Sequence, residues 1–303
     1  MKKTLSVHLE EIGFERDLRH LIIEIGHAIK WVARKCRYEF RGKSGSENVF
    51  GEKQLELDVL ADRIFTEKME NSGLVSVVAS EEKDGIHEVS PAKKGKFAVA
   101  FDPLDGSSLV DVNLAVGTIC AVFSGDTFLG KKGKDMQVAL YAVYGPQTTM
   151  VLAGQQGGVH EYRLNEVGEF ELEYEDIRVA NKAKNFAPGN LRAAGENKDY
   201  QKEIINFINE GYTLRYSGGM VPDVNHILLK GQGIFSYPPC QKHPQGKLRL
   251  LFECAPLGFI MTKAGGKASD GRGDILEKEI KEVSERTPIF LGSTEEVDKF
   301  VGK

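Results

Sequence analysis

The feature that most constrains this chain is FAVAFDPLDGSS, residues 97–108, in which an apolar run ends abruptly in carboxylates. Residues 97–101 are apolar over the length of a strand, and Asp102 and Asp105 follow closely. Pro103 biases Asp102 toward an extended backbone, so the strand can continue to that point and then turn. The run therefore predicts a strand that carries two carboxylates at its end.

The residues that follow this strand predict a loop that binds a cation and a phosphate. Gly106 permits close approach of another group, and Ser107 and Ser108 suit a helix N-cap, where N–H groups attract anions. The two aspartates and a main-chain carbonyl such as that of Leu104 can reach hard cations. Two such ions about 3.5–4 Å apart can hold the attacking and leaving oxygens of a phosphoryl transfer. Alone, however, an Asp-Gly-Ser string after a strand usually indicates only a turn.

Three more carboxylates favour the cation site over the simple turn. Glu81 and Glu82 follow another strand-length apolar run, Val75–Ala79, and Glu253 interrupts the apolar run LRLLFECAPLGF. A carboxylate in such a run is costly to bury without a cation or a partner. We therefore do not expect all of these carboxylates to lie on a solvated face.

Length and composition indicate which partners to expect. The 303 residues can form one large domain or two lobes. The net charge of −4, without blocks of like charge, gives no support to a nucleic-acid or anionic-membrane partner. No apolar run approaches the ~20 residues of a membrane-spanning helix. We expect a cytoplasmic protein that acts on a small molecule, with four reduced cysteines, because none has paired or metal-ligand spacing.

The mixture of helical and strand patterns predicts an α/β or α+β fold. The expected helices are residues 17–35, 57–69, 200–209 and 222–229, with a last helix after Ser293 and Glu296, which resemble a capping box. The expected strands are residues 75–79, 97–101, 113–123, 137–153 with a turn at 144–146, 248–252 and 288–291. A polar segment, residues 41–53, is expected to be a mobile loop. A shift in composition places a boundary between an N-terminal lobe, residues 1–180, and a C-terminal lobe, residues 181–303.

Four motifs resemble those of the class I fructose-1,6-bisphosphatases and the related sedoheptulose-1,7-bisphosphatases. They are SEE at 80–82, FDPLDGSS at 101–108, RYSGGMVPD at 215–223 and GKLRLLFECAPLGF at 246–259. The likeness runs from about Asp17 to Phe300 and implies a layered sugar-phosphatase fold with two mixed sheets. VGTIxxVxxGD near 116–126, FAPGNLRA and YTLRYSGGMVPDVN resemble the sedoheptulose branch more. Hydrolysis of the 1-phosphate of fructose 1,6-bisphosphate is still the leading expectation, because many microbial enzymes of this pattern are expected to accept both sugars.

The resemblance implies a role for each acidic residue. Magnesium, two or more ions per site, or manganese in its place, would be held by Glu81, Asp102, Asp105, Glu253 and the Leu104 carbonyl. Glu82 and Asp58 would polarise the attacking water. Asp58, without the resemblance, would be an ordinary exposed helix residue. Glu52 completes the catalytic group, with a longer side chain than the aspartate found in much of the family.

The resemblance also implies the substrate contacts. Residues Asp105, Gly106, Ser107 and Ser108 would cradle the 1-phosphate, and Asn190, Tyr216, Tyr237 and Lys247 would meet the sugar and the distal phosphate. Arg215 would reach into a neighbouring subunit's site, so we expect a homo-oligomer, a dimer or a tetramer. INEGY at 208–212 abuts the RY motif instead of preceding it by roughly thirty residues, so Tyr212 is not expected to contact the substrate.

Two other classes of function stay open. A non-catalytic module that binds sugar phosphate or metal would have the phosphate contacts without the water-activating carboxylates, whereas Glu82 and Asp58 are both present. An enzyme similar to inositol monophosphatase would usually show a late WDxAAG motif, and the only tryptophan is Trp31.

Two regulatory features of the family are expected to be absent. Regulated animal members hold the AMP phosphate with a Thr-Gly-Glu turn, a Lys-Tyr pair and an arginine. Here residues 15–17 are Glu-Arg-Asp, residues 96–97 are Lys-Phe, and residue 124 is serine. Plastid sedoheptulose bisphosphatases carry two cysteines where this chain has Arg41 and Ser46. We therefore expect weak or absent inhibition by AMP and no thiol switch.

Overall fold

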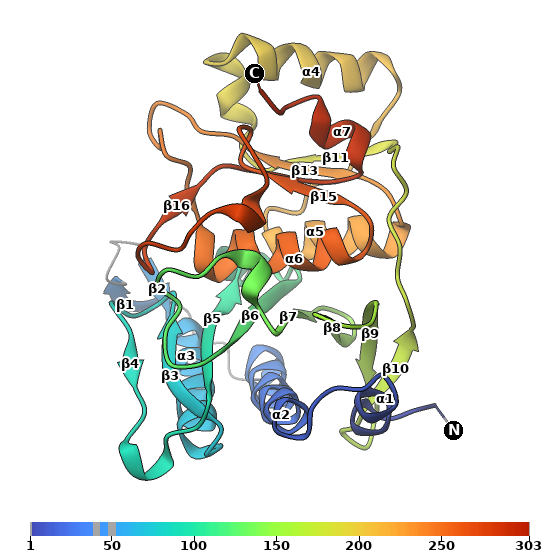
Figure 1. The fold of residues 1–303 in the computed structure, drawn as a ribbon. Coiled ribbons are helices and arrows are strands. Elements are labelled where there is room, and N and C mark those ends of the chain that lie inside the picture. Colours follow the sequence, from blue (N-terminus) through green and yellow to red (C-terminus); the bar gives the residue numbers. More distant parts are fainter. Residues whose placement is uncertain (1, 39–42, 48–52, 303) are drawn as a thin grey trace.

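The computed structural model describes residues 2–38, 43–47 and 53–302, which fold into stacked layers of helices and strands (Figure 1). The helices are α1 (Leu5–Glu11), α2 (Arg16–Tyr38), α3 (Glu56–Asn71), α4 (Lys198–Asn209), α5 (Met220–Lys230), α6 (Ala255–Lys263) and α7 (Thr294–Asp298). The first strands are β1 (Lys43–Glu47), β2 (Lys53–Leu55), β3 (Val75–Ser80), β4 (His87–Glu88), β5 (Phe97–Asp105), β6 (Val116–Ser124), β7 (Val138–Tyr144), β8 (Thr148–Gly154), β9 (Val159–Leu164) and β10 (Phe170–Tyr174). The later strands are β11 (Asn185–Pro188), β12 (Thr213–Leu214), β13 (Ile234–Tyr237), β14 (Leu248–Arg249), β15 (Lys267–Ser269), β16 (Arg286–Thr287) and β17 (Ile289–Gly292).

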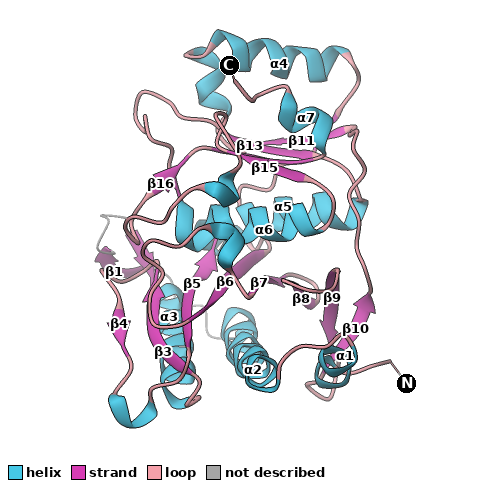
Figure 2. Cartoon of the chain, viewed as in Figure 1, coloured by secondary structure: helices cyan, strands magenta, loops and turns pink. Residues whose placement is uncertain are grey.

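Five layers follow one another through the molecule. Helices α1, α2 and α3 cover one face of an eight-stranded sheet, and α5 and α6 cover its other face (Figures 1 and 2). A five-stranded sheet lies beyond α5 and α6, and α4 and α7 form the last layer (Figure 2). The predicted α/β class with two mixed sheets is confirmed.

The larger sheet has the strand order β10-β9-β8-β7-β6-β5-β3-β4, and β3 and β5 are its parallel pair. Successive side chains of a strand point to opposite faces. In β5, Ala98 and Ala100 accordingly pack toward α5 and α6, and Val99 and Phe101 pack toward α2 and α3. Both faces of β5 are thus buried, which explains its nearly continuous apolar run.

The smaller sheet has the order β12-β11-β13-β17-β15. It shares one hydrophobic core with the inner face of the larger sheet, since Val221 of α5 and Phe259 of α6 belong to the same buried cluster as Ala100 of β5 and Leu291 of β17. The two sheets are therefore joined by packing as well as by the chain.

Most elements expected from the sequence are present, but there are several differences. The predicted loop over residues 41–53 contains β1 and the start of β2, and its residues 41, 42 and 48–52 lie outside the described residues. The sequence patterns do not predict helix α1 or the strands β4, β9, β10, β11, β12, β13, β15 and β16. The predicted strand 248–252 is wrong beyond Arg249, because Leu250–Cys254 form a π-helical turn, η5.

One predicted cap is wrong and another is confirmed only in its position. Gly106, not a serine, occupies the N-cap of the short 3-10 helix η2 (Ser107–Val112), and it adopts φ +75°. Ser293 is the N-cap residue of α7, but it makes no side-chain capping hydrogen bond; its Oγ accepts the Gly233 N–H at 3.3 Å. Among the described residues, no helix combines the length and apolar character needed to span a membrane.

Candidate active site

Parallel pairing of β3 and β5 brings two acidic strand ends together. Ser80 lies opposite Phe101, and the Glu81 N–H donates to the Phe101 carbonyl at 3.0 Å. The carboxyl ends of parallel strands lie at one edge of a sheet, which is where sites form in such folds. Glu81 and Glu82 therefore lie at the same edge as Asp102.

The end of β5 bulges where it passes β6. Asp102 is paired with Ile119, but Asp105 is paired with Gly117, so three steps along β5 match two along β6. One extra residue of this kind is a β-bulge, which bends a strand and redirects its side chains. The Leu104 N–H donates to Asp102 Oδ1 at 2.9 Å inside the bulge.

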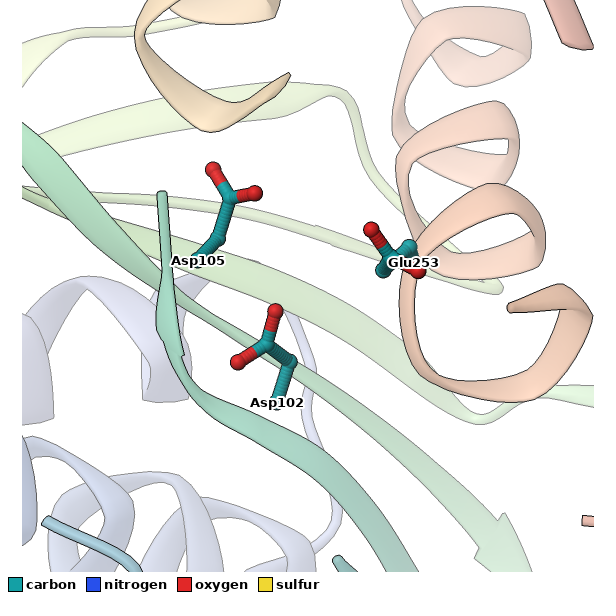
Figure 3. Close-up of side chains that lie close together, drawn as sticks. All are labelled: Asp102, Asp105 and Glu253. Carbon is teal, nitrogen blue, oxygen red and sulfur yellow. The ribbon is translucent and has the colours of Figure 1, made fainter. Parts of the chain in front are cut away.

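A third carboxylate joins the two aspartates from the opposite side. Figure 3 shows Asp102 and Asp105 on strand β5 and Glu253 on the helical segment that faces it. One carboxylate oxygen from each residue lies within 4.8 Å of those of the other two. The three side chains are nearly inaccessible to solvent, with exposed fractions of 3%, 7% and 7%.

Burial makes this concentration of negative charge costly. Burial, together with repulsion from Glu81, Asp105 and Glu253, raises the pKa of Asp102 well above its usual value. Burial raises the pKa of Asp105 to about 6 and that of Glu253 to about 7. Backbone N–H donors oppose these shifts without abolishing them, at 2.7 Å from Val221 to Asp105 and at 2.6 Å from Arg249 to Glu253.

The donor set fits a hard divalent cation. Its members are carboxylate oxygens, the ligands that Mg²⁺, Mn²⁺ and Ca²⁺ prefer. A bound cation would offset the cost of holding three acids close together in a buried place. The raised pKa values and the oxygen ligands thus both indicate a site for a divalent cation.

Asp105 also connects strand β5 to helix α5, which lies between the two sheets. Its carboxylate accepts the Val221 N–H at 2.7 Å and the Met220 N–H at 3.4 Å, at the beginning of α5. A Cβ on Gly117 would lie 2.4 Å from the Val221 side chain, so glycine is required there for α5 to come this close. The negative charge also suits a helix N-terminus.

A cleft of about 1440 Å³ opens over the cluster. Nearly all of the site residues expected from the sequence line it: Asp58, Glu81, Glu82, Asp102, Leu104, Asp105, Gly106, Ser107, Ser108, Asn190, Tyr216, Tyr237, Lys247 and Glu253. Arg215 is not among the lining residues; its guanidinium donates to the Leu214 carbonyl at 3.1 Å, and its side chain is exposed. Glu52 lies outside the described residues.

Residues near the acidic edge hold defined positions. Asp58, in the first turn of α3, is only 2% exposed, so the expectation of an exposed helix residue is wrong. The Glu82 N–H donates to Ser80 Oγ at 3.3 Å, and Glu81 lies 3.8 Å from Nε of the buried Arg249. These contacts fix the backbone of the acidic pair.

The cleft lining also includes the polar residues expected to meet a sugar phosphate. Asn190 Nδ2 donates to the Pro238 carbonyl at 3.0 Å, and the Tyr216 hydroxyl donates to the Gly189 carbonyl at 3.3 Å. Tyr212 also lines the cleft, but its hydroxyl donates to Glu296 Oε1 at 2.8 Å.

The sequence analysis does not find four lining residues whose side chains are basic. They are Arg192, Lys242, His243 and Arg286. Arg192 lies inside the FAPGNLRA string, which was the available signal for it. The other three come from segments without a recognisable pattern, and only the folded chain brings them to the cleft.

Comparison with known proteins places this arrangement in a family. Residues 4–175 match the family model described as "Fructose-1-6-bisphosphatase, N-terminal domain", and residues 179–302 match "Fructose-1-6-bisphosphatase, C-terminal domain". The two-sheet fold with an acidic cleft is therefore that of a sugar-bisphosphatase family. The chain belongs to the fructose-1,6-bisphosphatase family.

Individual relatives agree with this assignment. A protein of Syntrophotalea carbinolica named fructose-1,6-bisphosphatase class 1 is 45% identical over 97% of this chain and 91% of its own length. A chloroplastic sedoheptulose-1,7-bisphosphatase of Triticum aestivum is 43% identical over 98% of this chain and 75% of its own length. The crystal structure of Leishmania major fructose-1,6-bisphosphatase in holo form superposes with a TM-score of 0.93, at 32% identity, over 99% of this chain and 98% of that one.

Proposed function

We propose that this chain hydrolyses the 1-phosphate of fructose 1,6-bisphosphate, giving fructose 6-phosphate and inorganic phosphate. The observation that carries the proposal is the buried cluster of Asp102, Asp105 and Glu253, which lines the same cleft as Tyr216 and Lys247. Such a cleft combines acidic residues that suit a cation with polar and basic residues that suit a phosphorylated sugar.

Magnesium is the cofactor that we propose for the acidic end. Glu81, Asp102, Asp105, Glu253 and the Leu104 carbonyl would hold it, and Mn²⁺ has similar ligand preferences. When bound, such ions polarise a phosphoryl oxygen and lower the pKa of a bound water.

We assign the proton transfer to the acidic edge. The Glu82 carboxylate takes a proton from the attacking water, with Asp58 beside it in the cleft wall and Glu52 as the third member of the group. The water oxygen forms a bond to phosphorus while the bond from phosphorus to the C1 oxygen breaks. The sugar oxygen leaves and takes up a proton.

The other residues bind and orient the substrate. Gly106, Ser107 and Ser108, beside Asp105, offer backbone N–H and hydroxyl groups to the 1-phosphate. Asn190, Tyr237 and Tyr216 offer directional donors to the sugar, and Lys247 offers a point charge to the distal phosphate. Holding both ends of the substrate aligns the scissile phosphate with the attacking water.

Arg215 fits a role between subunits. Its exposed side chain lies beside the cleft residues Leu214 and Tyr216 but does not line the cleft itself. We propose a homo-oligomer, a dimer or a tetramer, in which Arg215 completes the partner's site, and a cytoplasmic location for it.

Sedoheptulose 1,7-bisphosphate is a second candidate substrate. The 43% identity to a sedoheptulose-1,7-bisphosphatase supports it, as do the volume of the cleft and the extra basic residues Arg192 and Lys242. A sugar that is one carbon longer would extend the distance between its two phosphates.

A phosphate-release panel tests these assignments. The substrates are both bisphosphates, fructose 6-phosphate, fructose 1-phosphate and inositol 1-phosphate, each with Mg²⁺ and after chelation. We expect Mg²⁺-dependent release from one or both bisphosphates and little from the monophosphates. Preferential release from inositol phosphate, or none from any substrate, would reject the proposal.

A further inference from the structure

We propose that the Thr118 hydroxyl, held by Tyr144, is a positioning group that fixes Asp102 for cation binding through the Pro103–Leu104 peptide. This inference rests on the proposed function, since it concerns the same acidic site. Neither Thr118 nor Tyr144 lines the cleft, so both act at a distance from the substrate.

The bulge in β5 explains why a side chain is needed at this place. The ladder between β5 and β6 skips from the Asp102–Ile119 pair to the Asp105–Gly117 pair, which leaves Thr118 opposite the bulge. Pro103 has no N–H to donate to a ladder. Its carbonyl accepts the Thr118 hydroxyl at 2.7 Å instead.

The donors and acceptors among Tyr144, Thr118 and Pro103 follow from the chemistry of the three groups. A carbonyl oxygen can only accept, so the single hydroxyl hydrogen of Thr118 goes to Pro103. The Tyr144 hydroxyl, 2.7 Å from Thr118 Oγ1, must then donate to it. Burial raises the pKa of Tyr144 well above its usual value, so this donor keeps its proton.

The Pro103–Leu104 peptide connects the Thr118 hydroxyl to the Asp102 carboxylate. Its carbonyl accepts from Thr118, and its N–H donates to Asp102 Oδ1 at 2.9 Å. A peptide unit is planar, so fixing its carbonyl also fixes its N–H. One oxygen of Asp102 is thereby occupied and the rotation of its carboxylate is restricted.

The location of these hydrogen bonds, next to the proposed ligands, suits a role in cation binding. Thr118 is fully buried and Tyr144 is 7% exposed, so both hydroxyls are largely shielded from bulk water. The peptide that Thr118 holds ends at Leu104, whose own carbonyl, in the next peptide unit, we assign to the cation. Loss of the Thr118 hydroxyl would therefore release Asp102 directly and remove one constraint on the neighbouring Leu104.

The test measures binding of Mn²⁺, the paramagnetic stand-in for Mg²⁺, by the full chain without substrate. Electron paramagnetic resonance of free Mn²⁺ gives the Kd of wild type, Thr118→Val, Thr118→Ser and Tyr144→Phe. We expect Thr118→Val, which keeps the shape but not the hydroxyl, to raise the Kd about tenfold, near the lower end of the effect of losing an outer-shell partner. Thr118→Ser should restore the wild-type Kd, and Tyr144→Phe should raise it by roughly threefold.

Ser76→Ala is the matched control. The buried Ser76 Oγ lies 2.9 Å from the Phe97 carbonyl and 2.8 Å from the Gly125 carbonyl, at the opposite end of β5, and its single hydrogen is shared between them. Its loss should lower the Tm, as Thr118→Val does, and should leave the Kd for Mn²⁺ and the rate of phosphate release unchanged.

Each outcome decides the inference. A wild-type Kd in Thr118→Val, or an equal loss of affinity in Ser76→Ala, overturns it. If Thr118→Val does not fold, a wild-type Kd in Tyr144→Phe overturns it instead. A wild-type protein that binds Mn²⁺ but hydrolyses no sugar bisphosphate rejects the proposed function alone, whereas one that binds no Mn²⁺ rejects both.

Discussion

Replacing Glu253 by glutamine should stabilise the metal-free protein while it removes most of the activity. Burial raises the pKa of Glu253 from 4.5 to about 7, although its carboxylate accepts the Arg249 N–H. At about 1.4 kcal/mol per pH unit, the ionised side chain costs the folded state about 3 kcal/mol above pH 7. Glutamine keeps an acceptor for Arg249 and carries no charge, so it avoids this cost.

The sign of the pH dependence follows from linkage. The folded state holds the Glu253 proton up to about pH 7, whereas the unfolded state releases it near pH 4.5. The folded chain thus binds more protons between these values, and the stability of the wild type falls as the pH rises through this window. The advantage of Glu253→Gln should be nearly absent at pH 4.5 and complete above pH 7.

Thermal unfolding with and without Mg²⁺ is the assay. In chelator at pH 8 we expect the Tm of Glu253→Gln to exceed that of the wild type by about 3–6 °C, taking about 1–2 °C per kcal/mol for a chain of this length. In excess Mg²⁺ the difference in Tm between the two proteins should shrink or change sign. A ligand at about 100 times its Kd stabilises the wild type by about 2.7 kcal/mol. Turnover should fall at least about 10²-fold, since a Lewis acid contributes several kcal/mol.

Glu161→Gln is the control for this prediction. Glu161 is also buried, burial raises its pKa, and it lies on β9 away from the cleft. Its substitution should not change the response to Mg²⁺ or the turnover. A Glu253→Gln protein that is less stable than the wild type in chelator at pH 8, or whose advantage persists at pH 4.5, would refute the reasoning.

Four further predictions follow from the same contacts. Glu82→Gln should cut turnover by roughly 10²–10⁴ and leave Mn²⁺ affinity largely intact; unchanged turnover with collapsed affinity would mean that the two neighbouring glutamates have exchanged roles. Asp102→Asn and Asp105→Asn should both lower turnover by orders of magnitude, but in chelator only Asp105→Asn should lower the Tm, because both Asp105 oxygens accept N–H groups of α5 and an amide offers only one acceptor. AMP should inhibit weakly or not at all, because Lys96 is already paired with Asp17 at 2.8 Å; half-inhibition at low micromolar AMP at saturating Mg²⁺ would contradict this. Phosphate release should be equal with and without dithiol, since the four cysteines are free; a large reversible gain would show a thiol switch.

Periodicity predicted the elements that have one clear pattern. Helices α2 and α3 have an apolar stripe, and β3 and β5 contain nearly continuous apolar runs because helices cover both faces of the sheet. Strand β10 is an edge strand and β9 is its neighbour; they carry half-exposed polar residues such as Arg163, Glu171 and Glu173, so their sequence resembles a polar loop. Their pairing with neighbouring strands decides their conformation, and no local signal reports it.

The sequence predicted those site residues that place a carboxylate within or at the end of an apolar run. Asp102, Asp105 and Glu253 each end or interrupt an apolar run, and the structure brings all three together. Thr118 could not be found this way, because threonine is ordinary in a strand. Its role depends on a bulge and on a tyrosine 26 residues away.

Glu253 lies in the acidic cluster as predicted, although the secondary structure predicted next to it was wrong. The run LRLLF, residues 248–252, predicts a strand, because a short continuous apolar run does not distinguish a buried strand from a buried helical turn. Leu250–Cys254 form the π-helical turn η5 instead, whose first N–H donors are partly met by the Glu253 carboxylate itself, through the N–H of Arg249. Turns of this kind are frequent at functional sites, since the extra residue redirects a side chain. A buried carboxylate needs a cation or another partner in a strand and in a helical turn alike, so the prediction for Glu253 did not depend on its secondary structure.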